Sequence, residues 1–309
     1  MSAASVPSNP AVTFEPYRRR LLGLAYRMLG SMADAEDAVQ EAYLRWHAAD
    51  RDKVADARAF LMATTARICV DMLTSARARR EKYVGPWLPE PVLDTAALAP
   101  DSRAELAEDL SVALLLALDR LSPLERAAFL LHDVFDFSFR EVARTLERSE
   151  AACRQLAARA RSHVRAAQPR GTAPPAPPSG EIDPKSARLI ATFVEATRSG
   201  DLDTLTQLLA SDARVVTDGG GKAAAALNVL EGADRAARFL VGASRKGWRE
   251  DYTLRFAAIN GLPGVLVASP HGLVQTSAFE IAGDVVRALY IVRNPDKLRH
   301  LTAAPARSG

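Results

Sequence analysis

Apolar residues recur every three or four positions through the first part of the chain, which is the spacing of an amphipathic helix. They predict three helices: one ends before Gly30-Ser31, one buries a face that includes Trp46, and one runs from about 57 to 80. The positions that carry the period are Tyr17, Leu21, Leu24, Ala25, Met28 and Leu29, then Ala35, Ala38, Val39, Ala42 and Trp46, then Phe60, Leu61, Thr64, Ile68, Asp71 and Met72. A helical bundle is therefore expected over 12–83.

A second helical block, expected over 104–168, contains the most specific pattern. From Phe137 the sequence reads FSFREVARTLERSEAACRQLAARARSHVR: a short amphipathic helix, a turn at Glu147-Arg148 and a helix rich in Arg and Gln. Ser149 is a good N-cap for that helix. Glutamate tolerates left-handed backbone poorly, so a strained or longer turn is expected at Glu147, where many such motifs have glycine. The order is typical of a helix-turn-helix; the alternative is an αα-hairpin in an ordinary bundle.

Two proline-rich segments divide the chain. Residues 84–103 form a connector that contains Trp87-Leu88-Pro89-Glu90-Pro91 (WLPEP). Since proline is excluded from helix interiors, this connector is expected to be extended, with two large apolar side chains that need a surface to cover them. The segment 169–181 contains GTAPPAPPSG, whose composition predicts a solvated linker.

The pattern changes beyond the linker, where residues 182–302 begin with helices and end with strands. Helices are expected at 186–197, 202–209 and around 233–241, and strands at 213–217, 252–260, 265–268, 273–281 and 285–292. Helices first and consecutive, antiparallel strands later predict an α+β domain.

Composition and charge exclude several classes of protein. The 309-residue chain has a net charge of +3 and two cysteines, which lie far apart and are expected to be reduced. No signal peptide, metal-ligand spacing or apolar run of the ~20 residues of a membrane span is visible. A cytoplasmic protein with no metal or cofactor is expected. Arginines at 148, 154, 159, 161, 165 and 170 form either a solvated helix face or a surface for phosphates.

Longer stretches resemble a known family. LLGLAYRMLGSMADAEDAVQEAYLRW and DARAFLMATTARICVDMLTSARARRE resemble region 2 of extracytoplasmic-function (ECF) sigma factors, and the block from 105 to 167 resembles their region 4. WLPEP, DGGGK at 218–222 and NPDKL at 294–298 resemble the subgroup with a C-terminal SnoaL-like domain, a cone-shaped α+β fold shared with ketosteroid isomerase. The resemblance implies sigma region 2 over 12–83, region 4 over 104–168 and a SnoaL-like regulatory domain over 182–302.

The resemblance also implies partners and contact residues. In this family the helix that carries DAEDAVQE docks on the clamp helices of the β′ subunit of core RNA polymerase. The β subunit of the polymerase is also an expected partner. The candidates here are Asp37, Gln40, Glu41 and Arg45. The alternative is a solvated acidic face.

The third helix and the loop before it resemble the element that opens minus-ten promoter DNA. A melted strand needs an apolar or aromatic pocket for a flipped base and cations for its backbone. The candidates are Arg58, Phe60, Arg67, Arg77, Arg79 and Arg80, with a plain core role as the alternative for Phe60. Region 4 would read the minus-35 element in the major groove, with Arg154 and Gln155 on base edges and Ser149, Arg159 and Arg161 on phosphates.

An enzymatic C-terminal domain is an alternative, because some relatives of this fold are enzymes. Acid–base chemistry in such a cone needs a carboxylate or His in an apolar pocket. The candidates Asp218, Tyr252, His271, Asp284 and Tyr290 form no recognisable catalytic constellation, and His271 is expected in an exposed loop. DGGGK fails the phosphate-loop pattern, since Val216 replaces the first glycine and Ala223 follows the lysine. A tight turn is expected there.

A regulatory C-terminal domain is the favoured interpretation. The resemblance implies that it contacts the sigma core within the same chain, with WLPEP as the natural place; alternatively, WLPEP threads the RNA exit path of the polymerase or packs on region 2. The candidate contacts are Trp87, Leu88, Pro89, Glu90 and Pro91, then Asp218, Gly219, Gly220, Gly221 and Lys222, then Asn294, Pro295, Asp296 and Lys297. No separate anti-sigma protein is implied.

The sequence therefore predicts two all-α sigma domains plus an α+β cone, and an alternative sigma factor that is not an enzyme. Two alternatives stay open. One is a one-component helix-turn-helix regulator with a ligand-sensing cone. The other is a SnoaL-type enzyme with an accessory DNA-binding half.

Overall fold

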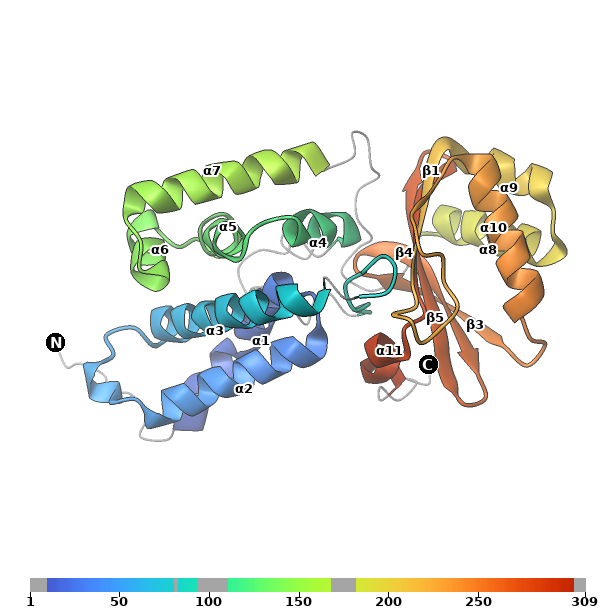
Figure 1. Cartoon of the computed structure of the whole chain (residues 1–309). Helices are drawn as coiled ribbons and strands as arrows, with labels where there is room; N and C mark the ends of the chain where they lie inside the picture. The colour runs from blue at the N-terminus through green and yellow to red at the C-terminus, as the bar shows by residue number, and fades with distance from the viewer. Residues whose placement is uncertain (1–9, 81–82, 94–110, 168–181, 303–309) are drawn as a thin grey trace. The chain divides into compact units, whose positions relative to one another are not determined.

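The computed structural model describes residues 10–80, 83–93, 111–167 and 182–302, except for the side chains at 76–80, 167 and 302. These residues form two compact units (Figure 1). The first unit contains 10–80 and 113–167, and the second contains 83–93, 111–112 and 182–302. The connector that holds WLPEP therefore belongs to the same compact unit as the C-terminal domain.

The predicted N-terminal helices are confirmed as α1 (Pro10–Leu29), α2 (Met32–Ala48) and α3 (Ala57–Arg80), with a short 3₁₀ turn, η1 (Arg51–Lys53), between the last two. Ser31 begins α2 as its N-cap, because its side chain accepts a hydrogen bond from Asp34 N at 3.2 Å. The apolar faces meet in a core in which Leu21, Leu24 and Trp46 are almost fully buried.

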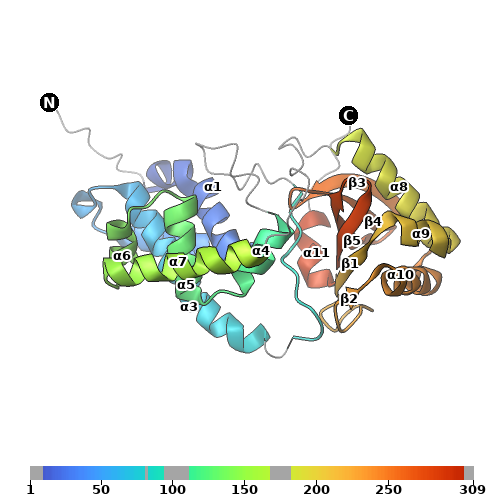
Figure 2. The same ribbon diagram turned by 90° about the horizontal axis from the view of Figure 1, so that it is seen from above.

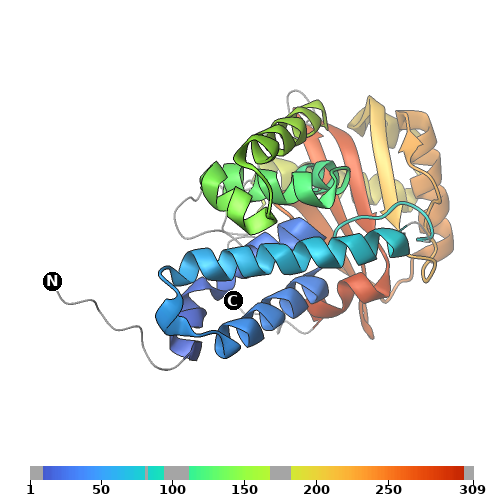
Figure 3. The same ribbon diagram turned by 60° about the vertical axis from the view of Figure 1, so that its left-hand side comes forward.

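The second helical block continues the first unit. It consists of α4 (Val112–Asp119), α5 (Pro123–Phe129), the π-helical segment η4 (Leu130–Val134), α6 (Phe139–Leu146) and α7 (Glu150–Ala167). The helix-turn-helix prediction is confirmed by α6 and α7. Glu147 ends α6 in a left-handed conformation, with φ 53° and ψ 48°, so the strain expected at this turn is present. Figure 3 shows α3 alongside α5 and α6, and it contacts both.

The second unit is the expected α+β domain. Helices α8 (Pro184–Ser199), α9 (Leu202–Leu208) and α10 (Ala233–Gly247) lie on one side of a sheet, and α11 (Pro295–Thr302) lies on the other (Figure 2). The strands are β1 (Leu209–Asp218), β2 (Leu230–Glu231), β3 (Thr253–Ile259), β4 (Leu262–Ser269), β5 (Gly272–Ala282) and β6 (Val285–Val292). Their order is β2-β1-β6-β5-β4-β3.

Two features of this sheet differ from the sequence expectation. The antiparallel pairing of consecutive strands is correct for β3 to β6, but β1 pairs with β6 in parallel. Strand β2 and helix α11 were not predicted, since two residues are too short for a period and the eight residues of α11 include only two large apolar side chains, Leu298 and Leu301. The parallel pair brings the ends of β1 and β6 together, with Thr217 opposite Ile291 and Asp218 opposite Val292.

Some expected absences can be compared with the described part of the chain. None of its helices is long and apolar enough to cross a membrane. Within the same residues no group of three or more His, Cys, Asp or Glu side chains is placed to hold a metal ion. Cys69 and Cys153 are buried and free, and burial raises the pKa of both thiols.

Candidate functional site

The connector is bound to the C-terminal domain along residues 83–92. It forms no helix or strand, as its prolines predict, and Leu88 and Val92 are only 1% and 7% exposed. Asn260 and Val92 are joined by two hydrogen bonds, much as paired residues of neighbouring strands are. The Asn260 backbone N–H donates to Val92 O at 2.8 Å, and its side-chain Oδ1 accepts from Val92 N at 3.1 Å. The apolar connector side chains are thus covered by their own chain.

The centre of this contact is the carboxylate of Asp218, at the end of β1. It is fully buried and accepts hydrogen bonds from Tyr83 Oη at 2.6 Å and from the Leu88 backbone N–H at 2.8 Å. Lys297 Nζ, on α11, lies 2.7 Å from Asp218 Oδ2 and also donates to Leu88 O. The Lys297 side chain is only 7% exposed. A buried ion pair is tolerated only where further hydrogen bonds satisfy both partners, and here the connector supplies them.

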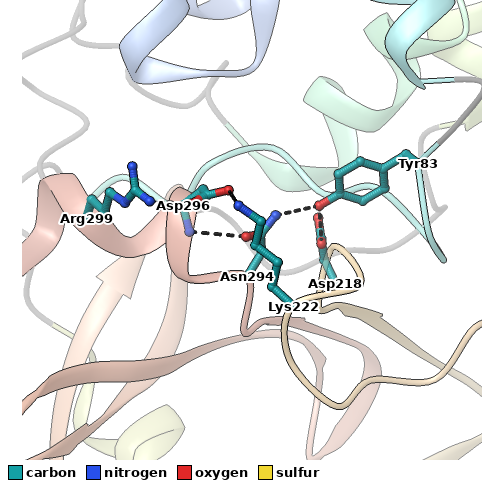
Figure 4. A network of polar contacts seen from close by, with 6 residues as sticks. All are labelled: Tyr83, Asp218, Lys222, Asn294, Asp296 and Arg299. Carbon is teal, nitrogen blue, oxygen red and sulfur yellow. Dashed lines mark hydrogen bonds and ion pairs between the residues drawn. The ribbon is translucent and has the colours of Figure 1, made fainter.

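Tyr83, on the connector, contacts the C-terminal domain both at the end of β1 and just after β6 (Figure 4). Its hydroxyl donates to Asp218 and accepts from Asn294 Nδ2 at 2.8 Å. Burial raises the pKa of Tyr83, and the neighbouring Asp218 carboxylate raises it further, so the phenol stays protonated and remains a donor. Lys297 Nζ lies 5.0 Å from the ring centroid of Tyr83 and 4.3 Å from that of Trp87, within range of a cation–π interaction.

The DGGGK loop is shaped by close packing, and no phosphate cradle is needed to explain its glycines. Gly220 has φ 57°, and a Cβ there would lie 2.2 Å from Asn294 Nδ2 and 2.8 Å from Tyr83 Oη. The tight turn is confirmed, since Lys222 N and Ala223 N both donate to Gly219 O. Lys222 Nζ pairs with Asp296 and holds the pKa of that carboxyl below its usual range (Figure 4).

The structure brings the three motifs WLPEP, DGGGK and NPDKL together. Asp218, Asn294 and Lys297 contact the connector, and Lys222 and Asp296 pair at the exposed edge. Leu88, Pro89, Glu90 and Pro91 are buried, Trp87 is half-buried, and Pro295 begins α11. We call the hydrogen bonds of connector residues 83–92 with Asp218, Asn260, Asn294, Lys297 and His300 the connector clamp; the exposed Lys222–Asp296 pair touches no connector residue through these bonds and is not part of it.

Three clamp residues were missed by the sequence reasoning. Tyr83 was treated as the end of a helix, and Asn260 as the end of a strand. His300, on α11, donates from Nε2 to Pro91 O at 2.8 Å, and its Nδ1 lies 3.9 Å from Glu90 Oε2. The dipeptide Asn260-Gly261 marks a tight β3–β4 turn, and it was the one local signal available.

The candidates for polymerase contact lie on the outward side of α2. Asp37, Gln40 and Arg45 are exposed, and Glu41 is half-buried. Glu41 and Arg45 form a surface ion pair at 2.9 Å. The helix therefore presents a polar surface and buries its apolar side, as expected.

The minus-ten candidates whose side chains the structure describes are Arg58, Phe60 and Arg67, and each contacts other residues of the helical unit. Arg67 donates from Nε to Thr145 O at 2.7 Å and from Nη2 to Arg144 O at 2.8 Å, so it binds the last carbonyls of α6. Arg58 Nη2 donates to Phe135 O at 3.3 Å. Phe60 is half-buried, with its ring centroid 5.5 Å from that of Trp46. The side chains of Arg77, Arg79 and Arg80 lie outside the described residues.

The minus-35 candidates lie on or just before α7 and differ in their exposure and partners. Ser149 caps α7 as predicted, with its Oγ accepting from Ala152 N at 3.2 Å. Arg154, Gln155 and Arg159 are exposed. Arg154 pairs with Glu150 at 2.9 Å, and its guanidinium carbon lies 5.3 Å from the ring centroid of Phe139.

Arg161 also has a partner within the chain. It is half-buried and pairs with Asp133 at 2.7 Å, so it fastens α7 to η4. Its assignment to a phosphate stays an untested prediction.

The candidates for catalysis are scattered. Asp218 is occupied by the connector, His271 is exposed as predicted, and Asp284 pairs with Lys185 on the surface. The Tyr290 hydroxyl donates to Glu280 Oε2 at 3.0 Å, and burial raises the pKa of both groups. Tyr252 alone of the five candidates lines the cavity of the C-terminal domain. The alternative of an acid–base site gains no support from this arrangement.

Comparison with known proteins gives a consistent result. The models of Sigma-70 region 2 and Sigma-70 region 4 match residues 13–79 and 111–164. The ECF RNA polymerase sigma factor SigJ of Mycobacterium tuberculosis is 41% identical over 294 residues, covering 92% of this chain and 91% of that protein. The probable ECF sigma factor SigI of the same species is 30% identical, covering 95% and 96%. The crystal structure of SigJ has a TM-score of 0.68 and 34% identity, covering 94% of this chain and 98% of that one.

Proposed function

The chain belongs to the ECF sigma factors of RNA polymerase, and on that premise we propose that its C-terminal domain regulates it in cis by holding the connector between its two sigma domains. The family establishes an alternative sigma factor for transcription initiation, which binds RNA polymerase and promoter DNA. The proposal adds that the C-terminal domain controls this activity. We propose that the protein acts in the cytoplasm, where polymerase and promoter are.

The observation that carries this proposal is the connector clamp. The connector is the only path between regions 2 and 4 along the chain, so its conformation limits where the two promoter-binding domains can lie. Asp218 and Lys297 hold Leu88 by both its backbone N–H and its C=O. Leu88 cannot take another course without losing its hydrogen bonds to both members of this buried ion pair, which would then lack the partners that satisfy it. The C-terminal domain can thus select between connector states, and a partner shifts that equilibrium only by binding one state better.

Promoter-specific run-off transcription with core polymerase tests this proposal. Tyr83→Phe removes one hydroxyl that bridges Asp218 and Asn294 and leaves the ring in place. We expect at least a threefold change in transcript yield relative to the parent chain, with unchanged affinity for core polymerase. A chain stopped near Arg170 should change yield in the same direction. Lys222→Met is the matched control, because it breaks only the exposed pair with Asp296. Equal yields from Tyr83→Phe and the parent chain would contradict the proposal.

Within the sigma domains, we assign polymerase docking on the β′ clamp helices to the outward face of α2. The supporting observation is the exposure of Asp37, Gln40 and Arg45 on a helix whose other face is core. We assign the minus-ten element to α3 and the loop before it. Arg58 and Arg67 are held by backbone carbonyls of the second helical block, so they reach DNA only after regions 2 and 4 separate. Release of the connector would permit that separation.

We assign reading of the minus-35 element to α7, with Arg154 and Gln155 on base edges. Arg154→Ala should lower affinity for the specific promoter by about 1–3 kcal/mol relative to a scrambled minus-35 element. Arg159→Ala should instead weaken both DNAs alike and reduce the salt slope of binding by about one. Fluorescence anisotropy of the polymerase holoenzyme on both DNAs distinguishes the two. Equal loss on both DNAs from Arg154→Ala would remove it from the base-reading set.

An attached regulator also makes a separate anti-sigma protein unnecessary, and we propose that this chain needs none. We further propose that the C-terminal domain performs no catalysis. This is supported by its cavity, since no Asp, Glu or His of the described residues lines it.

A further inference from the structure

The C-terminal domain encloses a cavity of about 520 Å³ between α8, α10 and the sheet. Its wall is mainly apolar, and Phe193, Leu254, Val267 and Leu289 are among the residues that form it. Cavities of ~300–1,000 Å³ with apolar walls and a few polar groups are typical of sites for small molecules. The size and lining therefore fit an apolar ligand.

The charged side chains around this cavity are all of one sign. Arg198, Arg238, Lys246 and Arg293 line it, while no Asp or Glu of the described residues does. Arg238 is paired with Asp234 and Arg198 with Glu195. Arg293 has no carboxylate partner among the described residues: its Nη1 donates to the Ala224 carbonyl at 2.7 Å, and its buried Nε has no hydrogen-bond partner there. A buried guanidinium nitrogen with no acceptor costs free energy that an anion would recover.

Polar groups with no charge lie deeper on the sheet. Gln275 and Ser277 line the cavity from β5, and Gln275 Nε2 donates to Ser277 Oγ at 2.9 Å. They add hydrogen-bonding capacity, but neither is a base. The described lining also has no Asp, Glu or His, which favours retention of a ligand over its conversion.

We propose that this cavity binds a small apolar molecule with one anionic end, such as a carboxylate, and that Arg293 binds the anion. The hydrocarbon part lies against Phe193, Val267 and Leu289, where it gains by leaving water. This assignment does not depend on the regulatory role of the domain.

The same strands that line the cavity also carry the connector clamp. Successive residues of a strand point to opposite sides. Thr217 lines the cavity, and Asp218 beside it holds the connector; Arg293 lines the cavity, and Asn294 beside it holds Tyr83. The backbone N–H groups of Arg293 and Asn294 both donate to Asp218 O, at 2.7 and 3.0 Å. Arg293, which follows β6, is therefore adjacent in sequence to one clamp residue, Asn294, and hydrogen-bonded through its backbone N–H to another, Asp218. That it alters the hold on the connector is a further claim, and it rests on the proposed function.

Direct titration of the full-length chain tests the binding site, with decanoate and 1-anilinonaphthalene-8-sulfonate as anionic probes and decanol as the neutral one. Arg293→Gln should weaken the binding of decanoate at least tenfold and that of decanol less than threefold. Arg238→Gln is the matched control and should change neither by more than threefold, because Arg238 is already paired. A parent chain that binds neither anionic probe would overturn the proposal, as would equal losses for decanoate and decanol in Arg293→Gln.

A second variant guards against a simple folding defect. Gly242 lies on α10 at the cavity wall, and a Cβ added there would meet no atom within 4 Å. Gly242→Leu should fill the space and abolish probe binding while raising the melting temperature, since leucine favours helix over glycine. Undiminished binding in this variant would place the probes elsewhere and overturn the site.

The link to the clamp has its own measurement. Coupling between two sites is reciprocal, so loosening the clamp must change ligand affinity by the factor by which the ligand changes the clamp. Tyr83→Phe should shift the decanoate dissociation constant at least threefold, and Lys222→Met should leave it unchanged. If the cavity binds decanoate equally in all three chains, the coupling is refuted and the site stands. If Tyr83→Phe alters transcription and decanoate never binds, the proposed function stands and the site is refuted.

Discussion

Replacing Lys297 by methionine is expected to lower the free energy of unfolding of the C-terminal unit by about 3–5 kcal/mol. Methionine has nearly the length of lysine and keeps its packing against Tyr83 and Trp87, so the change removes mainly the charge. The carboxylate of Asp218 would then remain fully buried with no cation beside it. A buried charge without its partner costs several kcal/mol, whereas the intact pair contributes little net stability. Urea denaturation of the full-length chain measures the loss.

Two further variants show whether burial is the cause. Lys222→Met breaks an ion pair whose side chains are 54% and 38% exposed, against 7% and 0% for Lys297 and Asp218, and should cost less than about 1 kcal/mol. Asp218→Asn combined with Lys297→Met removes both charges, and the double variant should lose about 1–3 kcal/mol less than the sum of the singles. Additive losses, or equal losses from Lys297→Met and Lys222→Met, would mean that the buried pair is not what holds this region.

Gly220→Ala is expected to destabilise the same unit by about 3–4 kcal/mol and to release the connector. The left-handed backbone at φ 57° alone costs an alanine about 1–2 kcal/mol. The new Cβ would also displace the Asn294 side chain, which caps α11 through Asp296 N and donates to Tyr83. A lost cap and a lost hydrogen bond add about 1 kcal/mol each. Urea denaturation gives the stability, and limited proteolysis of the connector shows its release.

Gly283→Ala is the matched control for this loop. Gly283 has φ 64°, close to that of Gly220, but a Cβ there meets no atom within 4 Å. It carries the backbone strain without the collision, so it should cost about 1–2 kcal/mol and leave connector proteolysis unchanged. If the two alanine variants behaved alike, the glycine at 220 would be needed only for its backbone, and the loop would have no part in holding the connector.

The sequence by itself determined most of the helices and strands, because their signals are local. Apolar spacing located α1 to α3 within a few residues at most, and the N-cap Ser149 with its arginine-rich helix predicted the helix-turn-helix. Alternating apolar and polar positions predicted the antiparallel strands β3 to β6. The family resemblance carried by WLPEP, DGGGK and NPDKL implied in addition that the C-terminal domain contacts the rest of the chain at the connector.

Only the tertiary structure decided how those words meet. Asp218, Leu88 and Lys297 are separated by about 80 to 210 positions along the chain and are joined because β1 and β6 pair in parallel and α11 follows β6. Tyr83 and His300 carry no local sign of their role, and Asn260-Gly261 indicates only a turn, since all three act on backbone or carboxylate groups far away along the chain. The partners of Arg58, Arg67 and Arg161 could not be predicted from the sequence either. The local pattern of an arginine on a helix face is the same whether it binds DNA or a carbonyl or carboxylate of its own chain. Secondary-structure propensity depends on neighbouring residues in the sequence. The partner of a buried polar group depends instead on which distant segments the folded core brings together.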